Sequence, residues 1–167
     1  EKIVTGAADL SLNGGISVTS GTLSSTGGTL GLPSGATLAT GASFSTSNTT
    51  LNLGGSLAVA DTWTSTSTSV SLTDNASLSS TEEMSLASLQ TNGYDFELAS
   101  ATSDLTIENA FALSGGETLS TQGADLIFES SADISSGSTL DASGGGKLEF
   151  QQGGTDNGTI NAENATF

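Results

Sequence analysis

Apolar residues recur along this chain in short apolar–x–apolar clusters, each followed by a turn rich in Gly, Ser or Asn. Between Gly123 and Phe150 the units read Gly-Ala-Asp-Leu-Ile-Phe-Glu, Ser-Ala-Asp-Ile-Ser-Ser-Gly and Ser-Thr-Leu-Asp-Ala-Ser-Gly, and then Lys-Leu-Glu-Phe starts the cycle again. Each unit is about seven residues long, which suits one short strand and one turn. Strand residues two apart point to the same side, so each strand sends one or two apolar groups into a shared interior.

Three such units make one lap, and the lap repeats along most of the chain. The first side of each lap starts at Leu10, Leu30, Leu51, Val70, Leu105, Leu126 and Leu148. The second side carries Ile16, Leu38, Leu57, Leu78, Phe111 and Ile134, and the third carries Leu23, Phe44, Trp63, Met84, Leu119, Leu140 and Ile160. We therefore expect Trp63 to stack in the core between its neighbours in this third column.

A repeat of this kind predicts an all-β fold, a parallel β-solenoid with three short strands per lap of about 20–22 residues. Right-handed coiling is expected, because parallel crossovers are right-handed by default. The structural alternative is an antiparallel β-sandwich, which would normally use longer strands joined by hairpin signals. Pro33 directly follows a first-side strand, and its missing N–H places it at a corner.

The chain reads as one domain. Residues 1–6 precede the repeat and are expected to form a lead-in strand or an arm that pairs with another molecule. Residues 7–167 form a single solenoid domain. The first-side starts at Val70 and Leu105 are separated by 35 positions, so we expect an irregular lap around residues 82–102.

Composition excludes several functional classes. The 167 residues contain no His and no Cys, only two Lys or Arg against 18 Asp or Glu, and the formal net charge is −16. Such a chain offers no His-based acid–base chemistry and no attraction for nucleic acid or an anionic membrane. The available nucleophiles lack a basic partner in a recognisable motif, so the chain is expected not to be an enzyme.

Acidic residues concentrate in the second half of the chain. Aligned laps put Asp104 and Asp125 in one column ahead of Lys147, and Glu108 and Glu129 in another. Stacked like charges repel unless something compensates them. These four carboxylates are therefore candidate Ca²⁺ ligands, since Ca²⁺ prefers several oxygen ligands. The alternative is a solvated acidic face that opposes aggregation, and no other cofactor is expected.

Small hydroxyl residues flank the third-side core positions. This regular ladder predicts a ligand face for ice or a glycan, formed by Thr22, Ser24, Ser43, Ser45, Thr62, Thr64, Thr118, Ser120 and Thr139. The alternative interpretation is that Ser and Thr are simply suitable residues for exposed strand positions.

The segments Ala8–Leu12, Ser103–Ile107 and Ala124–Phe128 share an apolar-x-apolar core preceded by Asp. In this style the chain resembles β-solenoid stretches of bacterial surface adhesins, such as autotransporter passengers, filamentous-haemagglutinin-like proteins and very large repeat adhesins. The resemblance implies an extracellular, cell-surface structural protein, and no functional residue is carried over. We expect a filament subunit or rod segment that self-associates end to end, because open strand edges template pairing. The alternative function is a binding module for glycan or ice.

Overall fold

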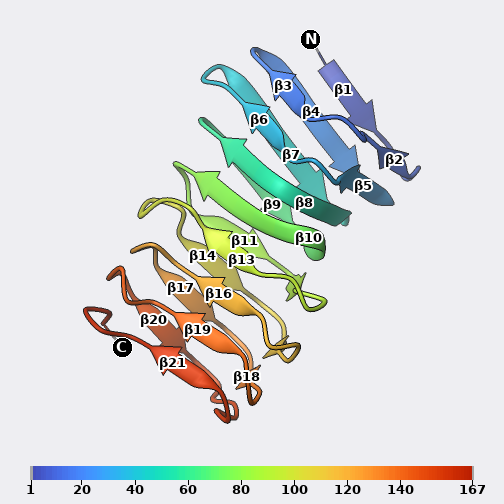
Figure 1. Cartoon of the computed structure of the whole chain (residues 1–167). Coiled ribbons are helices and arrows are strands. Elements are labelled where there is room, and N and C mark those ends of the chain that lie inside the picture. The colour runs from blue at the N-terminus through green and yellow to red at the C-terminus, as the bar shows by residue number, and fades with distance from the viewer. Residues whose placement is uncertain (1, 167) are drawn as a thin grey trace.

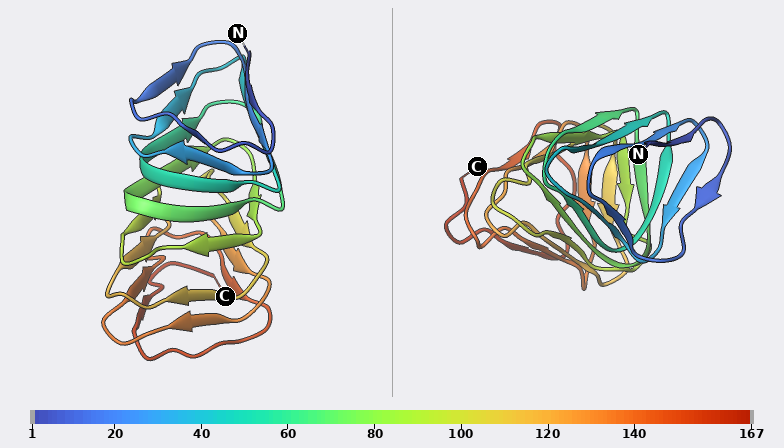
Figure 2. Two further views of the ribbon diagram at one scale, coloured as in Figure 1. Left: turned by 90° about the vertical axis from the view of Figure 1, so that its right-hand side faces the viewer. Right: turned by 90° about the horizontal axis from the view of Figure 1, so that it is seen from above.

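The computed structural model describes residues 2–166 as a rod of stacked laps with no helix in that range (Figure 1). Coils lie about 21 residues apart and make about 8 turns. Figure 2 shows the laps lying one upon another between the two chain ends, around a common interior. Every ladder between named strands is parallel, which confirms the predicted solenoid and excludes the antiparallel sandwich.

Three faces run along the rod, here called faces I, II and III. Face I consists of β2 (Leu10–Ser11), β5 (Thr29–Leu32), β12 (Ser88–Gln90), β15 (Phe111–Leu113) and β18 (Ala132–Ile134). Face II consists of β3 (Ile16–Val18), β6 (Ala36–Leu38), β13 (Phe96–Leu98), β16 (Thr118–Ser120), β19 (Thr139–Asp141) and β21 (Thr159–Asn161). Two long strands, β8 (Thr50–Val59) and β10 (Ser69–Ser80), pass from face I to face II.

Face III consists of two ladders that follow one another along the rod. The first contains β1 (Lys2–Thr5), β4 (Gly21–Thr26), β7 (Ala42–Ser47) and β9 (Trp63–Thr66). The second contains β11 (Met84–Leu86), β14 (Leu105–Ile107), β17 (Leu126–Phe128) and β20 (Leu148–Phe150). Strands β9 and β11 are in contact, so the two ladders form one face.

Register ties each lap to the next at nearly constant length. Paired residues are 19 apart at Phe44↔Trp63, 22 apart at Leu126↔Leu148 and 23 apart at Phe96↔Leu119. These offsets span the predicted lap length of about 20–22 residues. At the corner after β5, Pro33 lies in a turn, as expected, and Gly35 follows with a φ of 73°. A side chain there would meet the backbone of Ser56 in the next lap, so the corner requires glycine.

The interior is one apolar core of stacked columns. On face III, Leu23, Phe44, Trp63 and Met84 lie one above another, and all are at most 5% exposed. The rings of Phe44 and Trp63 have centroids 5.1 Å apart. The indole Nε1 of Trp63 donates to Thr46 Oγ1 at 3.2 Å. Trp63 is therefore a core aromatic, as its column predicted.

The predicted side assignment is wrong beyond Met84. Leu105, Leu126 and Leu148 continue the column of Trp63 and Met84 on face III and do not belong to the first side. Phe111 and Ile134 lie on face I instead of the second side, and Leu119, Leu140 and Ile160 lie on face II instead of the third. Every assignment in the second half is thus displaced by one face.

The physical reason for this displacement lies in the inward positions of face III. In the first laps the second inward residue there is a hydroxyl, at Ser25, Thr46 and Ser65, whereas from β11 onward it is apolar, at Leu86 and Ile107. The later strands therefore acquire the apolar–x–apolar signature that marks face I in the early laps. Early strands of face I and later strands of face III therefore share the apolar–x–apolar pattern although they stack on different faces.

Residues 82–102 supply one strand to each face, β11, β12 and β13, and β11 pairs with β14 at an offset of 21 residues. This segment is a complete lap. At the start of the chain, β1 pairs with β4 of its own molecule, joining Lys2 to Thr22 and Thr5 to Ser25. Residues 2–5 are therefore the first rung of face III, while Glu1 lies outside the described residues.

Candidate functional surfaces

The three strands of face III that follow β1 carry outward hydroxyls in register. We call this set the hydroxyl array: Thr22, Ser24 and Thr26 on β4, Ser43, Ser45 and Ser47 on β7, and Thr64 and Thr66 on β9. Thr22 Oγ1 and Ser43 Oγ are 3.0 Å apart and share a hydrogen bond. The predicted ligand residue Thr62 precedes β9, is exposed, and its carbonyl accepts the N–H of Phe44. Six predicted ligand-face residues are thus brought together on face III.

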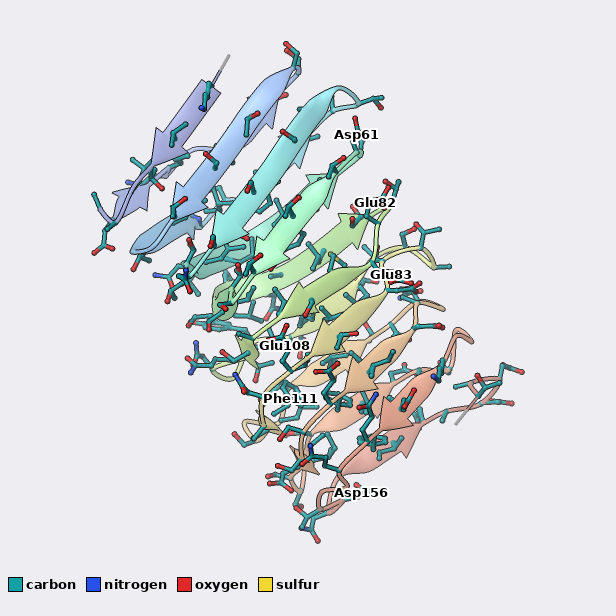
Figure 3. All side chains as sticks on the ribbon, turned by 180° about the vertical axis from the view of Figure 1, so that it is seen from behind. Asp61, Glu82, Glu83, Glu108, Phe111 and Asp156 are labelled. Carbon is teal, nitrogen blue, oxygen red and sulfur yellow. The ribbon has the colours of Figure 1, made fainter. Side chains whose placement is uncertain are left out.

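The remaining three predicted ligand-face residues lie elsewhere. Thr118 and Ser120 belong to β16 and Thr139 to β19, all on face II. The structure therefore does not form the continuous hydroxyl ladder that the sequence suggested. In its place, the later rungs of face III carry Asp104, Asp125, Glu149 and neighbouring acids, so that one face is hydroxylated in its first part and acidic in its second. Figure 3 shows Glu83 and Glu108 toward opposite edges of this face.

The candidate calcium ligands Asp104 and Asp125 bind backbone. Asp104 Oδ1 accepts the N–H of Asp125 at 2.8 Å, and Asp125 Oδ1 accepts the N–H of Lys147 at 2.7 Å. Glu108 Oε1 accepts the hydroxyl of Ser85. Glu129 follows β17, and its N–H donates to the carbonyl of Ile107. Within residues 2–166 no group of three or more acidic side chains is arranged to hold a metal ion.

On all three faces, Asp side chains accept hydrogen bonds from backbone N–H groups of the next lap. Asp9 accepts the N–H of Thr29 at 2.7 Å on face I, and Asp95 accepts that of Thr118 at 2.7 Å on face II. Each of these Asp residues stands directly before an inward apolar residue, as do Asp104 and Asp125. The Asp-apolar pairs in the sequence carried this signal, although we did not predict the bonds. The carboxylates close one end of a strand by accepting an N–H from the next lap.

Two further carboxylates have pKa values lowered by defined partners. The side chain and backbone of Thr155 donate to Asp133, and these hydrogen bonds lower the pKa of Asp133. Lys147 forms an ion pair with Glu149 through its side chain. That contact raises the pKa of Lys147 and lowers the pKa of Glu149. Lys147, which precedes β20, thus neutralises Glu149 on that strand, while its backbone N–H donates to Asp125.

Glu117 is a buried carboxylate at the corner between faces I and II. Glu117 is 2% exposed. Its Oε1 accepts hydrogen bonds from the hydroxyl of Thr91 at 2.6 Å and from the backbone N–H of Ser114 at 2.9 Å. Burial by itself raises the pKa of Glu117, and the hydrogen bonds to Thr91 and to backbone N–H groups outweigh it, so that the pKa is lowered. Oε2 has no hydrogen-bond partner among the described residues.

Face II carries a groove of about 570 Å³ that crosses β8, β10, β13 and β16, here called the face II groove. Its lining includes Ser56, Asn75, Ser77, Asp95, Glu97, Thr118 and Ser120. Two of the predicted ligand residues, Thr118 and Ser120, therefore belong to this groove and not to the hydroxyl array.

Comparison with known proteins assigns this chain to no family. A scan against protein-family models, a search of curated proteins and a search of solved structures found no match to this chain. Residues 2–166 include no helix long and apolar enough to cross a membrane.

Proposed function

We propose that this chain is a non-enzymatic structural rod whose end laps pair with further laps, supplied by the same polypeptide or by a second copy. The observation that carries the proposal is the interior. One apolar core extends from Val18 to Leu148, with each lap packed on the next. Repeat folds of this kind gain stability from every added neighbour, which favours extension along the axis.

Within residues 2–166, both end laps leave part of this core exposed. At the first lap Ile3, which pairs with buried Leu23, is 38% exposed. At the last laps an apolar cavity of about 160 Å³ is lined by Ala132, Ile134, Phe150 and Ile160, among others. Unpaired strand edges over an open apolar core are templates for pairing with another strand. These two surfaces are where further laps would add.

The proposed setting is the cell surface or the extracellular space. The resemblance to surface adhesins supports it, together with a composition rich in Ser, Thr and Gly and poor in Lys. In this setting the acidic second half of the rod keeps neighbouring rods apart laterally, because like charges repel. Association is thereby directed to the ends.

The test is light scattering and electron microscopy of the purified chain over a range of concentrations. We expect linear particles that lengthen in whole rods. Ile160→Lys places a charge in the open C-terminal end and is expected to leave single rods. Thr37→Lys, on the exposed outer side of β6, is the matched control and should assemble like the parent. Single rods at every concentration would exclude pairing with a second copy, and unimpaired assembly of Ile160→Lys would show that the C-terminal end lap is not a pairing surface.

A second candidate function is an ice-facing surface formed by the hydroxyl array. The observation that favours it is the in-register placement of eight outward hydroxyls on three adjacent strands. Thermal hysteresis of the purified chain measures this activity. Thr64→Tyr should abolish the hysteresis, whereas Ser120→Tyr, on face II, should retain it. A parent chain with no thermal hysteresis rules this function out.

A further inference from the structure

The face II groove is produced by a change in the length of one corner. Between faces I and II, β8 passes from Leu53 to Gly55 with one residue between them, whereas β10 passes from Leu72 to Ala76 with three. The register shifts at this point, and the two extra residues widen the lap. The following lap needs five connecting residues, 91–95, before β13 begins. The groove therefore lies where the laps widen, over the small residues Gly55 and Ala76.

Two polar side chains in the groove are fixed by lap-to-lap hydrogen bonds. Asn75 Oδ1 accepts the N–H of Asp95 at 3.0 Å, and Asp95 Oδ1 accepts the N–H of Thr118 at 2.7 Å. Glu97 lies on β13, two residues after Asp95, and its Oε1 accepts a hydrogen bond from Gln122 Nε2 at 2.8 Å. Each of these three side chains uses one polar atom in the protein. Within residues 2–166, Asn75 Nδ2, Asp95 Oδ2 and Glu97 Oε2 have no hydrogen-bond partner.

The outer column of the groove adds hydroxyls at the spacing of the laps. Ser56, Ser77, Glu97 and Ser120 are register partners on four consecutive laps. At the usual separation between hydrogen-bonded strands, this column is about 14 Å long. Three of its groups are hydroxyls, which donate and accept, and the third in order is a carboxylate, which only accepts. A ligand running along the column would meet one polar group per lap.

This chemistry selects a class of ligand. The lining contains two carboxylates and no cation, so it disfavours anions. An apolar ligand would leave the amide and the free carboxylate oxygens unpaired, which is costly. A neutral chain of sugar units offers hydroxyls that donate to Asp95 and Glu97 and accept from Asn75 and the serines.

We propose that the face II groove is a binding site for a neutral oligosaccharide laid along the rod axis across β8, β10, β13 and β16. The site is an open depression of about 570 Å³ on this face. Fixed polar groups lower the ordering cost of binding. The site does not depend on end-to-end association, and it is separate from the hydroxyl array on face III.

The experiment is a titration of the whole ¹⁵N-labelled chain with cellohexaose, xylohexaose, maltohexaose and chitohexaose, followed by NMR and calorimetry. At least one is expected to bind at micromolar to millimolar concentration, with shifts at the amides of Ser56, Ser77 and Ser120 and little dependence on salt. Ser77→Phe fills the groove and should weaken binding by about tenfold or more. Ser79→Phe is the matched control, since Ser79 is two residues along β10, on the same outer side, and outside the groove.

Three results would overturn the proposal. The first is the absence of binding by all four oligosaccharides at millimolar concentration. The second is binding that Ser77→Phe does not weaken. The third is displacement of the sugar-induced shifts by Ca²⁺ or putrescine with strong salt dependence, which would assign the groove to a cation. Thermal melts of both variants verify that they remain folded, and light scattering reports end association separately.

Discussion

At the scale of single residues, the polar groups inside the rod are more informative than the apolar ones. Most inward positions hold Leu, Phe or Ile, as expected for a stacked core. Glu117 is different, because a carboxylate that is 2% exposed must be compensated where it stands. Thr91 from the preceding lap and the N–H of Ser114 provide that compensation. Nothing in the sequence distinguished Glu117 from the many solvated acids, since its burial depends on which turn surrounds it.

Glu117 is therefore expected to make stability depend on pH. Its pKa in the folded chain is below the ordinary value of 4.5, so its contribution is present above that pH and is lost as the pH falls through the folded pKa. Glu117→Gln should lower the free energy of unfolding at pH 7 by about 1 kcal/mol, because bonds to a charged acceptor become bonds to a neutral one. Denaturant titrations of both chains from pH 7 to pH 3 measure the difference, in which the other acids cancel. A constant difference across this range would contradict the expected role.

At the scale of the element, the recurring device is an acceptor placed at the start of a strand. Asp125 shows it twice, donating its own N–H to Asp104 and accepting the N–H of Lys147. Asn75 does the same for Asp95 with a neutral amide oxygen. We therefore expect these positions to require the acceptor oxygen and not the charge.

Asp125→Ala leaves the Lys147 N–H without its partner and should destabilise the chain by about 1–2 kcal/mol. Asp125→Asn keeps an acceptor oxygen and should cost much less. Chemical denaturation gives both values, and hydrogen exchange at the Lys147 amide should quicken only in the Ala variant. Equal losses in the two variants would mean that the charge of Asp125 matters, and would return attention to cation binding.

Some features of the strands and laps are predictable from the sequence and others are not. Lap length, parallel stacking and the burial of Trp63 follow from apolar spacing, and the corner follows from the missing N–H of Pro33. The structure confirms all four. The face of each later strand does not follow from spacing. Leu86 and Ile107 replace the inward hydroxyls Ser25 and Thr46, so face III takes on the apolar–x–apolar pattern midway along the rod. The face II groove was equally inaccessible, because it arises from the residue count of a corner and not from any motif.

At the scale of the whole molecule, a solenoid with constant register should tolerate the loss of a complete lap. Met84 pairs with Leu105, which pairs with Leu126, so residues 105–125 are one lap of 21 residues. Their deletion joins Asp104 to Leu126 and recreates the Asp-Leu-x-apolar start of the strand. Every later strand keeps its face, because a whole lap is removed. The shortened rod should stay stable, because stability in such folds is close to a sum over neighbouring repeats.

We expect this shortened chain to fold and to melt cooperatively at a reduced temperature, lower by about 2–4 °C for each kcal/mol lost. The control is a smaller deletion, residues 105–114, which removes about half a lap. It moves face I residues onto other faces and turns inward side chains outward, so it should do more damage than the deletion that is twice as long. Circular dichroism melts of the three chains decide the matter. If the half-lap deletion is the better tolerated, individual laps are specialised, and the rod is held together by particular contacts instead of by its repeat.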